Sequence, residues 1–184
     1  FNMKNLIKLT LLFILFIGCN SKIQKEANVD NEDIEYVDLI GKFKRVELEK
    51  HPFIKDSFNL NYTDYKVDQE VLKKIKPLLK RDISIKVIMG TWCEDSRLLV
   101  PQFFKVMDKL RFNKRKIELI GLDNEKKSPD NYHEIYEIIN VPTFIFYRKE
   151  KEINRIVEIT IETLEKDIFS ILSDSGYENA YYGF

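Results

Sequence analysis

A single cysteine at the junction of a strand-like run and a helix-like run constrains this chain more than any other feature. Residues 83–88 form a β-branched run, residues 89–92 follow, and a helical pattern begins directly after Cys93. The N–H groups of a first helical turn have no partner within the helix, so they favour a thiolate at this position. The pattern predicts that Cys93 is a nucleophile; a retained but idle thiol is the alternative.

Two prolines accompany the cysteine. Pro101 lies inside the helical pattern, eight positions after Cys93, where a proline must kink a helix. Pro142 precedes the apolar run 143–147, so Val141-Pro142-Thr143 is expected to begin a strand. Between the two prolines, another strand-like run ends at residues 122–123.

Over residues 84–172 the chain resembles the thioredoxin-like superfamily. The resemblance rests on four features in this order: the Trp-Cys-x-x-Ser motif, the kink proline, the middle strand and the Val-Pro-Thr strand start. The resemblance implies an α/β, thioredoxin-like fold with a central mixed β-sheet flanked by helices. It also implies that Pro142 is cis and lies beside Cys93, with the Val141 backbone pairing with a substrate peptide. A trans proline that begins an edge strand is the alternative.

The residues around Cys93 modify its expected chemistry. Trp92 is expected to form a flat wall of the substrate site rather than part of the core. Glu94 and Asp95 stabilise the first helical turn but repel a thiolate, and Arg97 could offset this repulsion if its side chain turns back. Milder activation than in a strongly oxidising member of the superfamily is therefore expected.

Ser96 stands where the thioredoxin-like motif usually has its second cysteine. A dithiol reductase releases its product with that second sulfur, and a serine cannot perform this step. The buried carboxylate found six positions before the first cysteine in strongly active relatives is also missing, because position 87 is valine. Cys93 would therefore form a mixed disulfide and require an external thiol.

The N-terminus predicts export. Lys4 and Lys8 precede the apolar run 9–17, which is shorter than the roughly 20 residues needed to span a bilayer. Residues 16–19 resemble a bacterial lipobox, in which Cys19 is lipidated (palmitate included) and becomes the first mature residue. An uncleaved anchor helix or a plain signal peptide is the alternative. If Cys19 carries lipid, Cys93 is the single free thiol of the mature chain.

This organisation places the protein in the cell envelope, on a membrane surface that faces the periplasm or the exterior. The expected segments are a lipoprotein signal peptide at 1–18, a polar tether at 19–35, a thioredoxin-like domain with an N-terminal extension at 36–176, and an aromatic tail at 177–184. The tail is expected to pack back on the domain; docking to a partner is the alternative.

Periodicity and breakers predict the order of the elements. The expected elements are a strand within 36–50, an aromatic loop over 51–65, a helix capped by Asp68 and running to 79, a strand at 84–89, a helix at 94–112, a strand at 117–122, a helix at 132–139, strands at 143–147 and 153–159, and a last helix at 161–172.

Composition excludes some functions. The chain has 30 basic and 30 acidic residues, so its charge gives no reason to expect nucleic acid as a partner. His51 and His133 are expected to be surface or loop residues rather than metal ligands or bases. Asp123 and Glu125 could bind a cation, but a solvated loop is the preferred interpretation. We expect neither a metal nor a cofactor.

Two main hypotheses remain. The first is a membrane-tethered oxidoreductase in which Cys93 exchanges with a disulfide- or thiol-containing protein, helped by an external thiol reductant. The second is a redox-silent peptide-binding or chaperone-like lipoprotein that keeps the fold and its groove. A structural lipoprotein without a groove function is a third, weaker alternative. Accessibility and reactivity of Cys93 separate the first two.

Overall fold

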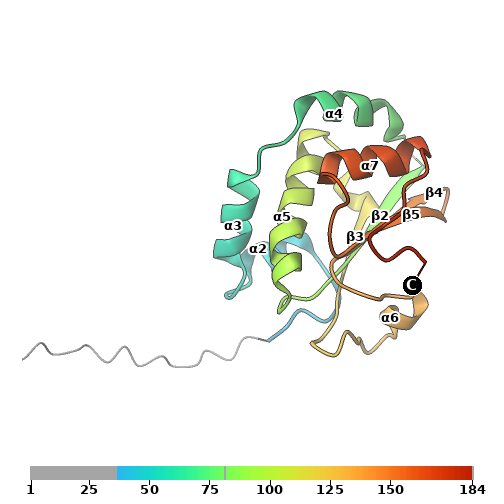
Figure 1. Ribbon diagram of the computed structural model, residues 1–184. Coiled ribbons are helices and arrows are strands. Elements are labelled where there is room, and N and C mark those ends of the chain that lie inside the picture. The colour runs from blue at the N-terminus through green and yellow to red at the C-terminus, as the bar shows by residue number, and fades with distance from the viewer. Residues whose placement is uncertain (1–36, 81, 184) are drawn as a thin grey trace, which may run out of the picture. The chain divides into compact units, whose positions relative to one another are not determined.

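The fold alternates helices with short strands over residues 37–80 and 82–183, the part of the chain that the computed structural model describes (Figure 1). The helices and strands are β1 Gly41–Phe43, α2 Arg45–Lys50, α3 Lys55–Asp64, α4 Gln69–Ile75, the 3₁₀ turn η1 Lys76–Leu78, β2 Ile83–Met89, α5 Glu94–Lys109, the 3₁₀ turn η2 Lys114–Lys116, β3 Ile117–Gly121, α6 Tyr132–Ile135, β4 Thr143–Arg148, β5 Lys151–Val157 and α7 Leu164–Ser173. None of the helices described here combines the length and apolar character needed to cross a membrane.

The five strands form one mixed sheet in the order β1-β3-β2-β4-β5. β2 and β3 are parallel, and every other neighbouring pair is antiparallel. Val87 of the central strand β2 pairs with Leu119 of β3 on one side and with Phe144 of β4 on the other. The β-α-β unit followed by a helix, a hairpin and a last helix confirms the predicted thioredoxin-like fold class.

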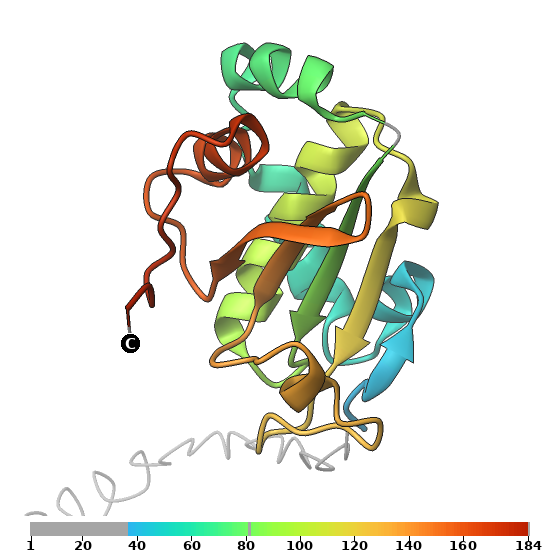
Figure 2. The same ribbon diagram turned by 90° about the vertical axis from the view of Figure 1, so that its right-hand side faces the viewer.

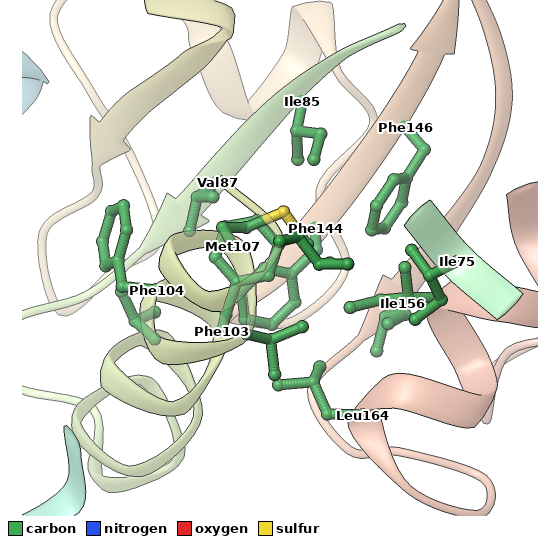
Figure 3. Packing of buried hydrophobic residues seen from close by; sticks show 14 of the residues in the cluster. Ile75, Ile85, Val87, Phe103, Phe104, Met107, Phe144, Phe146, Ile156 and Leu164 are labelled. Atoms are coloured by element: carbon green, nitrogen blue, oxygen red, sulfur yellow. The ribbon is translucent and has the colours of Figure 1, made fainter. Parts of the chain in front are cut away.

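The main core lies between the sheet and α5 with α7 (Figures 1 and 3). Alternate β2 side chains at Ile83, Ile85 and Val87 point into it and are at most 1% exposed. The ring centroids of Phe103 on α5 and Phe144 on β4 lie 4.9 Å apart. Burial of each such side chain contributes about 1.5–3 kcal/mol, so this layer fixes α5, and the residue that precedes it, against the sheet.

The opposite face of the sheet is covered only in part (Figure 2). A smaller buried cluster that includes Ile88, Ile120 and Ile145 lies there, and α6 lies over one end of it. The predicted helix at 132–139 is too long, since α6 ends at Ile135. Glu137 has a left-handed φ of 50°, which ends a helix of L-residues.

The N-terminal part of the domain corrects two predictions. The strand expected within 36–50 is only the three-residue β1, and α2 follows it. The aromatic loop expected over 51–65 is wrong, because Lys55–Asp64 form the helix α3. Phe58 is buried and Tyr62, one turn later, packs on the same cluster, so packing against α5 stabilises this helix.

Several smaller differences concern the ends of elements. Asp68 caps α4 as predicted, accepting from the N–H groups of Glu70 and Val71, and Pro77 falls in the 3₁₀ turn that ends this helix. α5 ends at Lys109 rather than 112. β5 begins at Lys151 and ends at Val157, two residues before the predicted limits at each end. α7 begins at Leu164 and ends at Ser173, rather than spanning 161–172.

The aromatic tail packs back on the domain over its described residues, as predicted. The carbonyl of Tyr177 accepts a hydrogen bond of 2.7 Å from Asn154, and its hydroxyl donates to Asp167 at 3.1 Å. Tyr181 donates to the Glu158 carboxylate through its hydroxyl. Burial, together with the nearby Asp167 carboxylate, raises the pKa of Tyr177.

Candidate functional site

Cys93 follows the short turn after β2 and is the N-cap residue of α5. Its backbone is extended, with φ −79° and ψ 126°, and its N–H donates to the carbonyl of Gly90 at 3.1 Å. The side chain is half-buried, and among the described residues Cys93 is the free cysteine. Cys19, the predicted lipidation site, lies outside the described residues.

The sulfur of Cys93 points toward the segment that begins β4. Its thiol donates to the carbonyl of Val141, with 3.2 Å between Sγ and the oxygen. The Val141–Pro142 peptide bond is cis, as the resemblance implied. No side-chain cap bond is present at Cys93, so the first turn of α5 donates no hydrogen bond to the sulfur.

Hydrogen bonds on both sides hold the proline segment in place. The buried hydroxyl of Thr143 donates to the carbonyl of Asn140 at 2.6 Å. The carbonyl of Pro142 accepts from the N–H of Glu158 at 2.8 Å. The cysteine therefore faces a strand start that is fixed to its neighbours rather than a free loop.

Trp92 is anchored beside the cysteine. Its indole N–H donates to the carbonyl of Leu122 at 3.0 Å, and its half-buried ring packs on the smaller cluster. A Cβ on Gly90 would lie 2.5 Å from this ring, so the turn needs glycine there. Whether Trp92 also contacts a substrate stays a prediction.

The positions around the missing second thiol are buried. Ser96 is 0% exposed, and its hydroxyl oxygen accepts from the N–H of Gly90 at 3.3 Å. Val87 lies in the core at 0% exposure. Ser96 thus joins the start of α5 to the turn after β2, and neither residue offers Cys93 a thiol or a carboxylate.

The charged side chains of Glu94 and Arg97, in the first turn of α5, differ in their exposure. The carboxylate of Glu94 is 92% exposed. The Arg97 side chain turns back toward the cysteine turn, as considered above, with Nη1 3.5 Å from the carbonyl of Trp92 and Nη2 3.8 Å from Glu94. Its guanidinium also lies 4.9 Å from the centre of the Phe53 ring.

The N-terminal extension contacts this turn, the end of β3 and the first turn of α5 through residues that sequence reasoning did not identify. Thr91, two positions before Cys93, donates a hydrogen bond to the Asp38 carboxylate. The Leu39 carbonyl passes so close to Gly121 that a Cβ there would lie 1.7 Å from its oxygen. Asn61 on α3 donates to the main-chain carbonyl of Arg97 at 2.9 Å.

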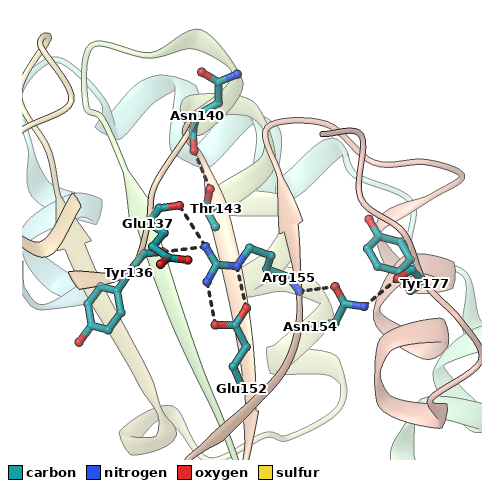
Figure 4. A network of polar contacts seen from close by, with 8 residues as sticks. All are labelled: Tyr136, Glu137, Asn140, Thr143, Glu152, Asn154, Arg155 and Tyr177. Carbon is teal, nitrogen blue, oxygen red and sulfur yellow. Dashed lines mark hydrogen bonds and ion pairs between the residues drawn. The ribbon is translucent and has the colours of Figure 1, made fainter. Parts of the chain in front are cut away.

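A second set of missed residues fixes the loop that leads to Pro142 (Figure 4). The Arg155 guanidinium on β5 donates to the carbonyls of Tyr136 at 2.7 Å and Glu137 at 3.3 Å, and it forms two 2.7 Å bonds with Glu152. Burial opposes the charge of Arg155, but the bonds with Glu152 outweigh it and raise the pKa of the guanidinium. No pattern in the sequence indicates this role, because a charged side chain on an edge strand usually points to solvent.

The remaining candidate residues have structural surroundings. His51 follows α2, but it is buried rather than at the surface, with Nε2 2.8 Å from the carbonyl of Val37. His133 lies on α6, with Nε2 3.9 Å from the Glu134 carboxylate. One oxygen of Asp123 accepts from the N–H groups of Glu125 and Lys127, which makes a compact loop. Within 37–80 and 82–183, no group of three or more acidic, histidine or cysteine side chains could hold a metal ion.

Comparison with known proteins supports the fold. No protein-family model matches the chain, and no curated protein matches it. A solved structure of a Pseudomonas aeruginosa protein of unknown function is similar at 13% identity, covering 74% of this chain and 95% of that one, with a TM-score of 0.56. An HIV epitope scaffold has the same identity and coverage and a TM-score of 0.55. A Fasciola hepatica thioredoxin matches at 17% identity over 57% of this chain and 91% of that one, with a TM-score of 0.37.

At 13% identity the likeness to the first two structures establishes the fold alone. The sheet order, the cysteine at the start of α5 and the cis proline at the start of β4 define the class: a thioredoxin-like domain. Its distinguishing features are the serine at position 96, the valine at position 87 and the α2–α3 extension, which contacts the first turn of α5.

Proposed function

We propose that this chain is a membrane-tethered thiol-disulfide oxidoreductase of the cell envelope that acts through Cys93 alone. The observation that supports this most directly is the position of the Cys93 sulfur, at the start of α5 and 3.2 Å from the carbonyl of Val141, beside the cis Pro142. The buried Ser96 and Val87 favour single-thiol chemistry over dithiol chemistry.

The proposed reaction is a sequence of thiol-disulfide exchanges. The Cys93 thiolate attacks one sulfur of a protein disulfide; the S–S bond breaks, a mixed disulfide forms on Cys93, and the other protein sulfur leaves as a thiolate that takes up a proton. An external thiolate then attacks the Cys93 sulfur of the mixed disulfide: the second protein sulfur leaves as a thiolate that takes up a proton, and a disulfide forms between Cys93 and the external thiol. A second molecule of the external thiol frees Cys93, so two external thiols are oxidised to one disulfide.

Substrate binding is coupled to this chemistry through Val141. Its carbonyl accepts the Cys93 thiol proton in the structure, and a thiolate could not donate this bond. A substrate peptide that pairs with Val141 as a strand would present its own N–H to the same oxygen. Binding would then displace the thiol from its acceptor and leave the sulfur free to face the substrate disulfide. Trp92 would flank the peptide, and Thr143 would hold the strand start.

The same contact gives the rival function its support. In the structure the Cys93 thiol donates to a main-chain carbonyl and takes no hydrogen bond from the first turn of α5. A redox-silent domain that binds peptides at Val141–Pro142 would have the same geometry. Measurement of covalent intermediates distinguishes the two functions.

The experiment is acid-quench trapping in cells. Under the oxidoreductase proposal, wild-type protein run without reductant shows adducts of higher mass that disappear on reduction, and Cys93→Ala abolishes them. Ser96→Ala serves as the matched control, because it alters the same turn and leaves the cysteine in place; its adducts should persist. Absence of adducts in wild type, together with slow alkylation of folded Cys93, would favour the redox-silent binding module.

The tether is part of the proposal and has its own test. The basic start, the apolar run 9–17 and Cys19 support lipidation. Cys19→Ser should release the protein from the membrane fraction or leave an unprocessed precursor of larger mass. Identical mobility and fractionation of mutant and wild type would contradict lipidation at Cys19 and would leave the chemistry of Cys93 unaffected.

A further inference from the structure

A positively charged cleft lies at one edge of the sheet. It has a volume of about 690 Å³ and fifteen lining residues, of which seven are lysine or arginine and one, Glu118, is acidic. Since the whole chain has 30 basic and 30 acidic residues, this excess of positive charge is local. A local excess of this kind attracts anionic partners even when the net charge is zero.

The cleft lies away from Cys93. Its lining includes Ser84 and Ile85 near the start of β2, whereas Cys93 follows the other end of that strand. At about 3.3 Å per residue, the strand from Ile85 to Met89 alone separates them by roughly 13 Å. The cleft is therefore a different site from the one that contains the cysteine.

An open strand edge borders the cleft. β1 pairs with β3 only from Leu119 to Gly121. Within the described chain, no strand lies beside Ile117 and Glu118 on this edge, and both residues line the cleft. An open edge of this kind can pair with the backbone of an extended segment from another chain.

Part of the positive charge is already compensated. Glu118 forms ion pairs with both Lys42 and Lys86, and burial, which would raise the pKa of this carboxyl, is outweighed by the two lysines, which lower it. Arg45 lies between the carboxylates of Glu49 and Asp108. Lys42, Lys86 and Arg45 therefore line the cleft as cations that already have carboxylate partners.

Three other cations remain available. Lys44, Arg115 and Lys116 line the cleft and are exposed, and none of them forms an ion pair within the described chain. An incoming anion can therefore reach all three without breaking an existing pair. The partly exposed Phe43 and the exposed Val46 add apolar surface to the same cleft.

The cationic surface continues beyond this cleft. Lys116 also lines a neighbouring cleft of about 630 Å³, whose other basic residues include Lys76, Lys80 and Arg111. Two adjoining clefts that share a lysine provide room for several residues of an extended chain. A flat bilayer would reach only their rims, so the concave shape favours a peptide.

We propose that this cleft binds an acidic, extended peptide segment of a partner protein. The peptide backbone lies along the open edge of β3 at Ile117 and Glu118. Its carboxylates pair with Lys44, Arg115 and Lys116, and an apolar side chain between them contacts the partly exposed ring of Phe43. This binding is independent of Cys93 and of the proposed oxidoreductase function.

The test uses the full chain and a fluorescein-labelled decapeptide of alternating glutamate and valine, followed by fluorescence anisotropy. We expect binding that weakens markedly between 50 mM and 300 mM salt, because contacts between exposed charges are screened. Arg115→Glu with Lys116→Glu should weaken binding by about tenfold or more. A decapeptide with glutamine in place of glutamate should bind much less.

The matched control is Lys149→Glu with Lys151→Glu, which changes the net charge equally at the β4–β5 turn, outside both clefts. It should leave peptide binding within twofold of wild type. Absent binding, equal binding of the glutamine peptide, or equal loss in the control variant would overturn the proposal. Binding to phosphatidylglycerol vesicles without binding to the peptide would also overturn it, in favour of a membrane contact.

Discussion

The side-chain amide of Asn61 on α3 donates a 2.9 Å hydrogen bond to the main-chain carbonyl of Arg97 on α5. In an uninterrupted helix this carbonyl would accept from the N–H four residues later, at position 101. That residue is Pro101, which has no N–H. The N-terminal extension therefore supplies the donor that the kink proline removes, one turn after Cys93.

This relationship predicts a coupled pair of substitutions. Asn61→Ala should lower the free energy of unfolding by about 1–3 kcal/mol, since it leaves the Arg97 carbonyl without its donor. In a Pro101→Ala background, the alanine N–H can bond to that carbonyl, and the same Asn61→Ala change should cost about 1 kcal/mol less. Urea denaturation of the four proteins measures this coupling.

A suitable control is Asn179→Ala in the tail, where the side-chain amide oxygen accepts from the N–H of Tyr181. This residue is remote in sequence from Pro101, so Asn179→Ala should lower the free energy of unfolding by the same amount in the wild-type and Pro101→Ala backgrounds. If Asn61→Ala also costs the same in both backgrounds, the amide does not compensate for the proline.

The sequence reveals the parts of the site that depend on local signals. Neighbouring residues predict the β-branched strand, the cysteine before a helix and the kink at Pro101. The cis Pro142 beside Cys93 was implied by the family resemblance. Asn61, Asp38 and Arg155 were missed because each one bonds to a residue far along the chain. Such contacts exist only after α3, residues 37–40 and β5 have packed.

The same distinction explains the errors in the elements. α3 contains asparagine, aspartate and aromatic residues that are poor helix formers, so local propensity favoured a loop. Its helical state depends on the burial of Phe58 against α5. α6 stops early because Glu137 is left-handed and the guanidinium of Arg155 takes up the carbonyls of Tyr136 and Glu137.

Introduction of a second thiol should change the reaction class. Ser96→Cys places a thiol three residues after Cys93, at a buried position in the first turn of α5. We expect a gain of insulin reduction with dithiothreitol as electron donor, because the new thiol can release mixed disulfides. The rate of insulin precipitation measures this gain.

Ser96→Ala is the control for the second thiol. Both variants remove the hydroxyl that accepts from the Gly90 N–H, and each should lose about 1 kcal/mol of stability. Only the cysteine variant should gain reductase activity. Efficient turnover by wild-type protein without a small thiol would contradict the role assigned to Ser96.

Glu118 predicts a pH-dependent contribution to stability. Burial would raise its pKa, but Lys42 and Lys86 outweigh burial, and the pKa is lowered from 4.5. A carboxyl whose pKa is lower in the folded state stabilises the fold above its unfolded pKa, and this contribution is lost as the pH falls through the folded value. Glu118→Gln should therefore lower the free energy of unfolding by about 1 kcal/mol at pH 7 and have a much smaller effect near pH 3.

Glu70→Gln gives the comparison for this pH dependence. Glu70 pairs with Lys73, and both side chains are more than 70% exposed, so its removal should change stability little at either pH. Urea titrations of the three proteins at the two pH values measure the difference. A constant cost of Glu118→Gln from pH 7 to pH 3 would show that the carboxylate contributes through packing rather than charge.

The carboxylates of Glu94 and Asp95 should slow the alkylation of Cys93. The alkylation rate should fall more with a negatively charged reagent than with a neutral one. Glu94 is fully directed to solvent, so its charge acts on the cysteine mainly through water. Two unit charges about 7 Å apart interact by about 0.6 kcal/mol in water, which corresponds to a two- to threefold effect per charge. Glu94→Gln with Asp95→Asn removes two such charges and should thus accelerate alkylation by neutral iodoacetamide about four- to ninefold at low salt. Alkylation by the anion iodoacetate should be accelerated more, because repulsion of the reagent is also removed.

Salt separates this electrostatic effect from a change of structure. At 1 M salt the screening length is about 3 Å, so both accelerations should nearly vanish. Asp64→Asn with Glu70→Gln removes the same charge from the end of α3 and the start of α4, and should leave both alkylation rates unchanged. An acceleration that persists at 1 M salt would mean that the substitutions expose Cys93 by loosening the first turn of α5, and the carboxylates would then control access to the sulfur rather than its charge.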